Sequence, residues 1–350
     1  MMDRSAEVVL QLLRGALNPS WQIVLPEGGD WDKALTLSME QCVCSICMEG
    51  IERLPVGSVP KAQLLQWFGQ SELQRGQYQF AWTTACKLDR LWAAEGIRAT
   101  VLKGRAISQY YAVPHHRYSC DLDVFIGKGW ERACELLEGR GVELGREVYK
   151  EVEFTMDDVY VECHRYITPL RGNRQLQAFE RYLRSLLESG ELTFFEGTTL
   201  VCPPLMFSVM LYVEHALGDF LHGKLLLKHV VDWVVLRRQA VDWETFGAKC
   251  KEFRFDRFVA LIEALADVVE GKREYDVLLA AYKEAFDEML REQEASADRR
   301  SWFQRRVQLF FEIIRNGRKF WSYGYTSMPS FLFHSVWSHF FEKEVRGMME

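Results

Sequence analysis

The sequence has no excess of basic residues. Its 350 residues include 43 Lys and Arg against 49 Asp and Glu, which gives a formal net charge of −6. A chain of this charge has no overall positive field that would attract the phosphates of DNA or RNA. We therefore do not expect nucleic acid as a partner.

The chain also lacks a long apolar run. Its most apolar stretches, such as residues 205–213, are shorter than the ~20 residues that span a bilayer. The first ten residues include Asp3, Arg4 and Glu7 and lack the basic start, apolar run and cleavage site of a secretory signal. We expect a soluble, cytoplasmic protein with no membrane span.

Cysteines are not arranged as a disulfide framework. There are nine of them, an odd number, scattered from Cys42 to Cys250, which suits a reducing compartment. Cys42, Cys44 and Cys47 could suggest a metal or redox site, but no second cysteine pair completes one. The apolar residues around them have helical spacing, which favours cysteines that pack as small apolar side chains.

What the sequence does contain is a change of pattern along the chain. Apolar residues recur with helical period up to about residue 95, and a long helix is predicted over 72–95. Residues 97–102 and 121–126 then have the pattern of strands, and helices are predicted over 105–111 and 130–140. The runs 147–155 and 159–167 flank Met156-Asp157-Asp158 and predict a hairpin.

After Pro203-Pro204 the helical period returns. We therefore predict an α+β protein in which a small mixed-sheet domain, residues 96–200, is embedded between an N-terminal helical region, 1–95, and a mostly α C-terminal domain, 201–350. Residues 302–341 are dense in aromatic side chains, which at helical spacing are more typical of a core than of a membrane or partner surface.

Two acids mark the strand over 121–126. Strand alternation places the side chains of Asp121 and Asp123 on one face and Leu122 on the other, so the two carboxylates can share a divalent cation. A pair of acids at this spacing is common by chance, and its surroundings must supply the specificity.

Two neighbouring patterns supply it. Lys103-Gly104 ends a β-rich run just before a predicted helix, a turn that can hold phosphate against backbone N–H groups. Alternation in the strand over 159–167 points Glu162 and His164 to the same face. A carboxylate on a neighbouring strand is what a two-metal phosphoryl-transfer site needs as its third ligand.

Together these residues resemble the uncharacterised nucleotidyltransferase family of the DNA-polymerase-β-type superfamily. That family has a lysine-glycine turn, an R…DxD pattern and a later DLH-type strand. The resemblance covers roughly residues 97–270 and continues through Pro203-Pro204, Glu214-His215 and Asp232-Trp233. Two departures are Arg105, where many members have Ser or Gly after the glycine, and Glu162, where Asp is commoner.

The resemblance implies a polymerase-β-like fold and a site for each part of the reaction. Asp121, Asp123 and Glu162 would hold two Mg²⁺ or Mn²⁺ ions, and a nucleoside triphosphate would be the substrate. Lys103 and Gly104 would bind its β- and γ-phosphates, and Arg117 would neutralise developing charge. The acceptor pocket would include His164, Glu214 and His215, and the acceptor would be a hydroxyl of a small molecule or a protein.

Other interpretations stay open. The same fold could be a non-catalytic nucleotide-binding or toxin-neutralising module, or the acids could activate water in a hydrolase. His215, His222 and His229 recur every seven residues and could bind a metal, although such histidines are more often ordinary core or surface residues. His115-His116 could contact substrate or form a solvated loop.

Overall fold

The computed structural model describes residues 3–119, 121–145, 149–169, 173–189, 192–291 and 316–324. The chain begins with four helices: α1 (Arg4–Leu17), α2 (Trp31–Glu40), α3 (Cys44–Glu52) and α4 (Lys61–Ala93). Asp3 and Asp30 cap α1 and α2 by accepting hydrogen bonds from backbone N–H groups of the first turn. The predicted helical start of the chain is confirmed.

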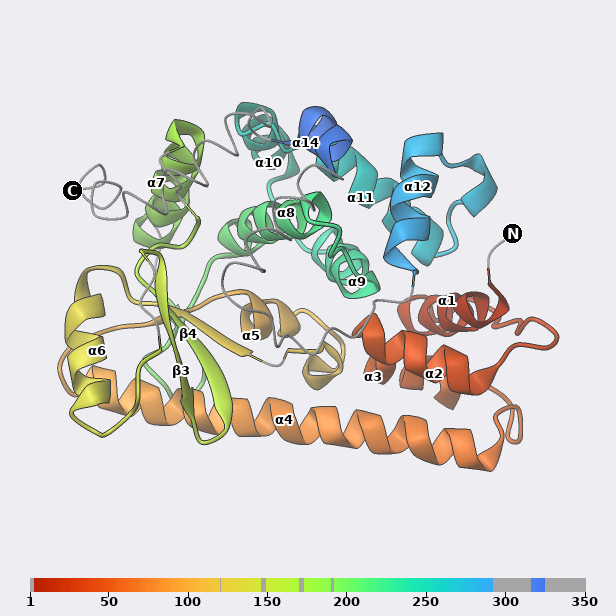
Figure 1. Ribbon diagram of the computed structural model, residues 1–350, viewed down its shortest axis with the longest axis horizontal. Coiled ribbons are helices and arrows are strands. Elements are labelled where there is room, and N and C mark those ends of the chain that lie inside the picture. Colours follow the sequence, from red (N-terminus) through yellow and green to blue (C-terminus); the bar gives the residue numbers. More distant parts are fainter. Residues whose placement is uncertain are drawn as a thin grey trace.

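Helix α4 is the longest helix described, with 33 residues, and begins well before the predicted residue 72. It runs along the base of Figure 1, from α2 and α3 at one end to the strands and α6 (Trp130–Glu138) at the other. Trp67 packs in a core with the N-terminal helices, whereas Leu88 and Trp92 pack in a second core beneath the sheet. One helix therefore joins the two parts of the molecule.

The six strands form one mixed sheet in the order β3-β4-β2-β1-β6-β5. Strands β1 and β2 are antiparallel, β2 and β4 are parallel, and β3 and β4 form the predicted hairpin. Asp157 and Asp158 make its two-residue turn with φ of 51° and 57°, the left-handed values that such turns require. The strands are β1 (Thr100–Val101), β2 (Asp121–Phe125), β3 (Glu151–Met156), β4 (Val159–His164), β5 (Thr193–Phe194) and β6 (Val201–Cys202).

The two faces of the sheet differ in chemistry. Leu122, Val124 and Val161 are buried on the face that packs against α4 and α6. The opposite face carries Asp121, Asp123 and Glu162, toward α5 (Lys103–Ser108) and the helices that follow the sheet. This alternation, which the sequence predicts, is what brings the acids together.

The helices that follow β4 in the chain share one apolar core with α1–α3. Pro204 stands at the N-cap of α8, as the Pro203-Pro204 pair predicts. Of the aromatic segment, only Phe320, Trp321 and Tyr323 fall within the described residues, and Phe320 is buried. These helices are α7 (Arg174–Glu188), α8 (Leu205–Leu221), α9 (Leu227–Leu236), α10 (Trp243–Glu252), α11 (Asp256–Val269), α12 (Ala280–Met289) and α14 (Gly317–Tyr323).

Two other expectations concern composition. Cys44 and Cys47 are buried in the shared core, and the eight cysteines within the described ranges are free thiols, as expected of structural cysteines. Among the helices described, none combines the length and the apolar character needed to cross a bilayer.

Candidate active site

The acids of the site lie on two adjacent parallel strands. In the register of β2 and β4, Asp123 stands beside Glu162, Asp121 beside Tyr160 and Phe125 beside His164. Partners in register on one sheet point to the same face, so the carboxyl groups of Asp123 and Glu162 lie together.

His164 joins these two carboxylates. Its Nε2 is 3.0 Å from Oδ1 of Asp123 and 3.4 Å from Oε2 of Glu162, and its Nδ1 is 3.0 Å from Oε2 of Glu151. Burial of the ring and nearby Lys150 oppose protonation, but the three carboxylates outweigh them and raise the pKa of His164. His164 thus lies in contact with acids from three strands.

Lys103 supplies a second positive charge. Its Nζ lies 2.8 Å from Oδ1 of Asp123 and 3.9 Å from Oε2 of Glu162. Burial alone would lower the pKa of Lys103, yet Asp123 and Glu162 raise it above its usual value. The residue has a φ of 39°, a left-handed conformation that costs a non-glycine residue about 1–3 kcal/mol. Such strain is typical of functional sites.

The two adjacent carboxyl groups differ in acidity. Burial would raise the pKa of Asp123, but Lys103 and His164 outweigh it and bring this pKa well below its ordinary value. His164 lowers the pKa of Glu162, yet burial and the charge of Asp123 outweigh it and raise this pKa. The pKa values of two close carboxyl groups move apart in this way, because the charge of one opposes the ionisation of the other.

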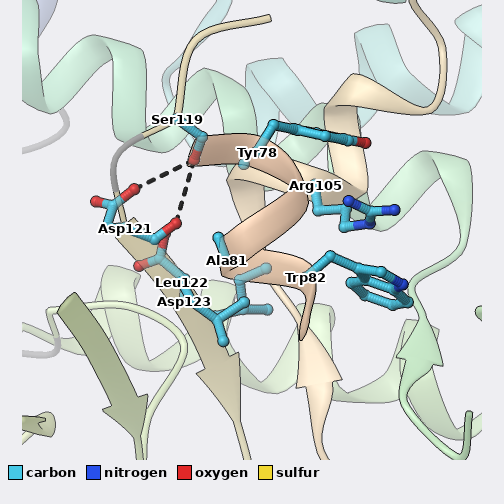
Figure 2. Close-up of a pocket in the computed structure, with 10 residues that line it drawn as sticks. Tyr78, Ala81, Trp82, Arg105, Ser119, Asp121, Leu122 and Asp123 are labelled. Carbon is cyan, nitrogen blue, oxygen red and sulfur yellow. Dashed lines mark hydrogen bonds between the residues drawn. The ribbon is translucent and has the colours of Figure 1, made fainter. Parts of the chain in front are cut away.

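Asp121 lies at the edge of a cleft. Ser119 Oγ is 3.3 Å from its Oδ1 and 3.2 Å from its backbone oxygen (Figure 2). The empty space at this cleft amounts to about 370 Å³, which counts open solvent at its mouth. It is lined by Tyr78, Ala81, Trp82, Leu102, Gly104, Arg105, Ser119, Asp121, Leu122 and Asp123.

Gly104 is buried directly behind Ser119. A Cβ at this position would lie 2.5 Å from Ser119 Oγ and 3.8 Å from Nη1 of Arg117. Glycine is therefore required for the close approach between α5 and the loop that carries Ser119 and Asp121. The strand-to-helix turn predicted at Lys103-Gly104 is present. The side chain of Ser119 occupies the space beside Gly104.

Arg117 is bound to a distant acid. Its Nε and Nη2 each lie 2.9 Å from a different carboxylate oxygen of Asp232 on α9, and both side chains are buried. Tyr111 also donates its hydroxyl to Asp232, at 2.6 Å. The guanidinium group of Arg117 therefore lies near Gly104 and is already bound to Asp232.

The predicted acceptor residues lie in different surroundings. His164 is fully buried among the acids. Glu214 and His215 lie on α8, where Glu214 is buried and the side chain of His215 is 42% exposed. Removal from water and the charge of Lys103 lower the pKa of His215, and they outweigh Asp219 and Asp123, which raise it. His215 therefore lies within electrostatic range of Lys103 and Asp123, although no described contact joins it to them.

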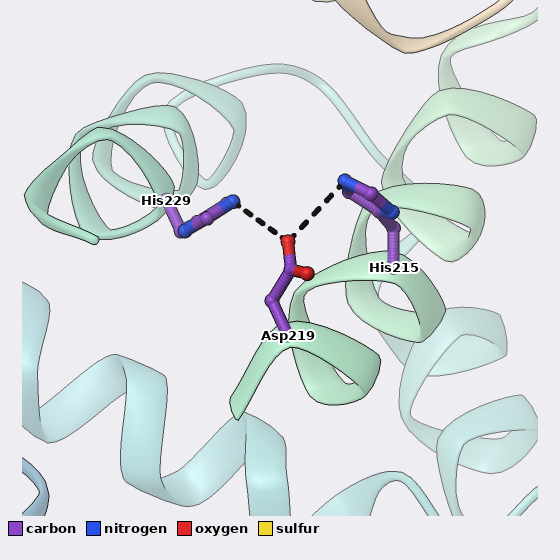
Figure 3. A group of neighbouring side chains, drawn as sticks. All are labelled: His215, Asp219 and His229. Carbon is purple, nitrogen blue, oxygen red and sulfur yellow. Dashed lines mark ion pairs between the residues drawn. The ribbon is translucent and has the colours of Figure 1, made fainter. Parts of the chain in front are cut away.

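His215 and His229 both point at Asp219 (Figure 3). Their Nε2 atoms lie 3.4 Å and 3.2 Å from the same carboxylate oxygen. Nδ1 of His229 accepts a hydrogen bond from the backbone N–H of Leu226, so Nε2 must carry the proton of a neutral ring. Histidines that bind a metal donate through their other nitrogen, so this group is better described as two histidines within ion-pair distance of one acid.

The remaining sequence candidates are held by local contacts. His116 Nδ1 lies 2.5 Å from a carboxylate oxygen of Glu49, and the backbone oxygen of His115 accepts a hydrogen bond from Gln74. His222 Nδ1 lies 2.7 Å from the backbone oxygen of Gly218. None of these described contacts joins the acid group.

Sequence reasoning missed Glu151 and Ser119, and it named Asp232 only as part of the family resemblance, without a role. Glu151 had a usable signal, since the two-residue turn at Asp157-Asp158 fixes a register that sets Glu151 opposite His164. Ser119 had none, and the partner of Asp232 had none, because these contacts follow from loop geometry and from packing between distant helices.

The site has the donors that a hard divalent cation prefers. Oxygen and nitrogen atoms of Asp123, Glu162 and His164 lie within 4.8 Å of one another, and Asp121 projects from the same face two residues away. Carboxylate oxygens are typical Mg²⁺ ligands, usually completed by water and substrate phosphates. The residues present therefore fit a magnesium or manganese ion.

A small mixed sheet with acids paired across parallel strands, beside a lysine-glycine turn into a helix, is the arrangement of the nucleotidyltransferase class. The sequence profile of one family, described as uncharacterised nucleotidyltransferase, matches residues 27–269. The chain belongs to this family. It matches no curated protein and no solved structure at a significant level.

Proposed function

We propose that the protein transfers a nucleoside monophosphate from a nucleoside triphosphate to a hydroxyl group of a small molecule or protein. The observation that carries this proposal is the pairing of Asp123 with Glu162 on β2 and β4, with Asp121 on the same face of β2. Family membership supports nucleotidyl transfer in general.

The contacts support a division of labour. Asp121, Asp123 and Glu162 would hold Mg²⁺, which would polarise the phosphates and acidify the acceptor hydroxyl. Lys103, already 2.8 Å from Asp123, turns toward the β- and γ-phosphates. His164 positions Asp123 and Glu162, and Arg117 and Asp232 hold the loop that leads to Asp121.

The reaction is a single displacement. The acceptor oxygen forms a bond to the α-phosphorus, and the bond from that phosphorus to the oxygen bridging to the β-phosphate breaks. Pyrophosphate and the hydroxyl proton are released. Glu214 and His215, on the helical side of the site, would contact the acceptor.

The test compares the native protein with Asp121→Asn/Asp123→Asn. Calorimetry with MgATP measures binding, and labelled ATP with cell extract measures transfer and pyrophosphate release. Asp157→Asn/Asp158→Asn is the matched control, because it removes the same charge from the remote hairpin turn. Asn also tolerates the positive φ values of these two positions. We expect transfer only in the native and control proteins, and equal transfer in all three refutes the proposal.

One observation favours a second candidate, a nucleotide-binding module without turnover. Lys103 and His164 already balance the charge of Asp123 and Glu162. Such a module predicts MgATP binding without labelled product. A hydrolase would instead release phosphate from the triphosphate.

A further inference from the structure

Arg105 lies between two aromatic rings beside the acids. Its guanidinium carbon is 3.9 Å from the centroid of the Trp82 ring and 4.4 Å from that of Tyr78. These rings come from α4, four residues apart, a spacing that places both on one face of the helix. Figure 2 shows the three side chains together at one wall of the cleft.

The rings are fixed by their own contacts. The Tyr78 hydroxyl is 3.0 Å from Ser108 Oγ, and the edge of Trp82 packs on Phe195 with 5.4 Å between ring centroids. Both faces of the guanidinium are therefore occupied, and stacking on a nucleobase is excluded. Only its in-plane N–H groups can bind a ligand.

Arg105 has no carboxylate partner among the described residues. Burial lowers its pKa, and the other groups that act on it are Tyr78 and Cys86. Arg117 and Arg237, by contrast, are each bound to acids. A half-buried cation without an anion is costly in a chain whose net charge is −6, so an anionic ligand would relieve the cost.

The residues that line the cleft indicate which kind of anion would bind beside Arg105. It is lined by Arg105 at one wall and by Gly104, Asp121 and Asp123 elsewhere. A triphosphate bound at the acids would extend along this cleft toward Arg105. In-plane donors of a guanidinium match the oxygens of a phosphate group in a two-point hydrogen bond.

We propose that Arg105, held by Tyr78 and Trp82, binds the terminal phosphate of the nucleoside triphosphate and makes the site selective for triphosphates over diphosphates. This inference rests on the proposed function, because it takes the phosphates to lie at Lys103 and the acids and gives the terminal phosphate a second contact at Arg105. A phosphate group on the acceptor would have the same chemistry, and the experiment separates the two sources.

The experiment measures the affinities of MgATP and MgADP by calorimetry for the native protein, Arg105→Gln and Arg105→Lys. We expect Arg105→Gln to weaken MgATP by about 10- to 100-fold, the usual effect of a charged hydrogen bond, and to leave MgADP nearly unchanged. Arg105→Lys keeps the charge but not the planar stack, so its loss should be smaller. Arg98→Gln, an exposed site at the other end of β1, is the matched control.

The outcomes are distinct. Native protein that binds neither nucleotide overturns the proposed function and this inference with it. Native protein that binds MgATP with the same affinity as Arg105→Gln overturns the inference alone, as does an equal loss for MgATP and MgADP. Unchanged MgATP affinity in Arg105→Gln together with reduced transfer of label into cell extract assigns Arg105 to an acceptor phosphate and also overturns it. Arg105→Lys guards against misfolding of the Gln variant.

Discussion

Arg117 and Asp232 form a buried two-point ion pair between residues 115 positions apart in the sequence. Arg117 lies in the loop before β2, and Asp232 lies on α9. The pair therefore ties the loop that leads to Asp121 to the helices after the sheet.

Removing one partner should destabilise the protein strongly. We expect Asp232→Ala to lower the free energy of unfolding by about 3–5 kcal/mol, because Arg117 stays buried without an anion. Arg117→Met/Asp232→Leu should recover most of this loss. Urea unfolding measures both, with Glu252→Ala as control, since its exposed pair with Lys249 should contribute only about 0–1 kcal/mol. If Asp232→Ala and Glu252→Ala lowered the free energy of unfolding equally, the buried pair of Arg117 and Asp232 would not be a major stabilising contact.

Gly104 and Ser119 test the close approach of α5 to the acid loop. A Cβ at Gly104 would lie 2.5 Å from Ser119 Oγ but 3.4 Å from Ser119 Cβ. Gly104→Ala should therefore cost about 1–3 kcal/mol of stability and displace Asp121. Adding Ser119→Ala should restore the stability, because it removes the clashing oxygen.

Gly76→Ala is the control for that pair. Gly76 lies in α4, and a Cβ added there would have nothing within 4 Å, so alanine should stabilise the helix by about 0.5–1 kcal/mol. Thermal unfolding of the four proteins gives the comparison. If Gly104→Ala is as harmless as Gly76→Ala, α5 does not approach the acid loop this closely.

Local patterns in the sequence predict the parts of the site that depend on alternation. The strand of Asp121 and Asp123 and the hairpin of Glu162 follow from period-two patterning and an Asp-Asp turn, and both are confirmed. Strands β5 and β6 have two residues each and carry no such pattern. The domain boundaries at 95 and 200 stay predictions, although α4 packs in both cores.

Long-range partners were beyond local patterns. Lys103 was predicted to meet phosphate, but its contact with Asp123 depends on the antiparallel pairing of β1 with β2. The contacts of Arg105 with Tyr78 and Trp82 join α5 to α4 across more than twenty residues of sequence. They depend on how the two helices cross. Such contacts are set by tertiary packing, for which a single sequence gives no periodic signal.

Glu270 should make stability depend on pH in the acid range. Burial opposes its ionisation, but hydrogen bonds from Arg238, Lys272 and Arg237 outweigh it and lower its pKa. A lowered folded-state pKa gives stability that is complete above the unfolded value, about 4.3 for Glu, and is lost as pH falls through the folded value. Glu270→Gln should thus be less stable than native protein at pH 7.

Urea unfolding between pH 7 and pH 3 checks this. The difference between native protein and Glu270→Gln should shrink below about pH 4 as the native carboxyl becomes protonated. Glu188→Gln, at an exposed position on α7, should show no such trend. A difference that grows toward acid pH would mean that folding raises the pKa of Glu270 instead of lowering it.

Replacing Lys103 should change Mg²⁺ affinity and nucleotidyl transfer in opposite directions. Its ammonium group lies beside Asp123 and Glu162 and competes with a divalent ion for their charge. Lys103→Met should therefore bind Mg²⁺ alone more tightly, on the order of tenfold, because like-charge repulsion is removed. The same change should lower nucleotidyl transfer by about 100-fold, since the phosphates lose a cation.

Calorimetry with MgCl₂ measures the first effect and the transfer assay measures the second. Lys87→Met is the control, because it breaks an exposed pair with Asp157 far from the acids and should change neither quantity. If Lys103 only stabilised the fold, its loss would not tighten Mg²⁺ binding. Weaker or unchanged Mg²⁺ affinity in Lys103→Met would therefore contradict the competition between this ammonium group and the ion for Asp123 and Glu162.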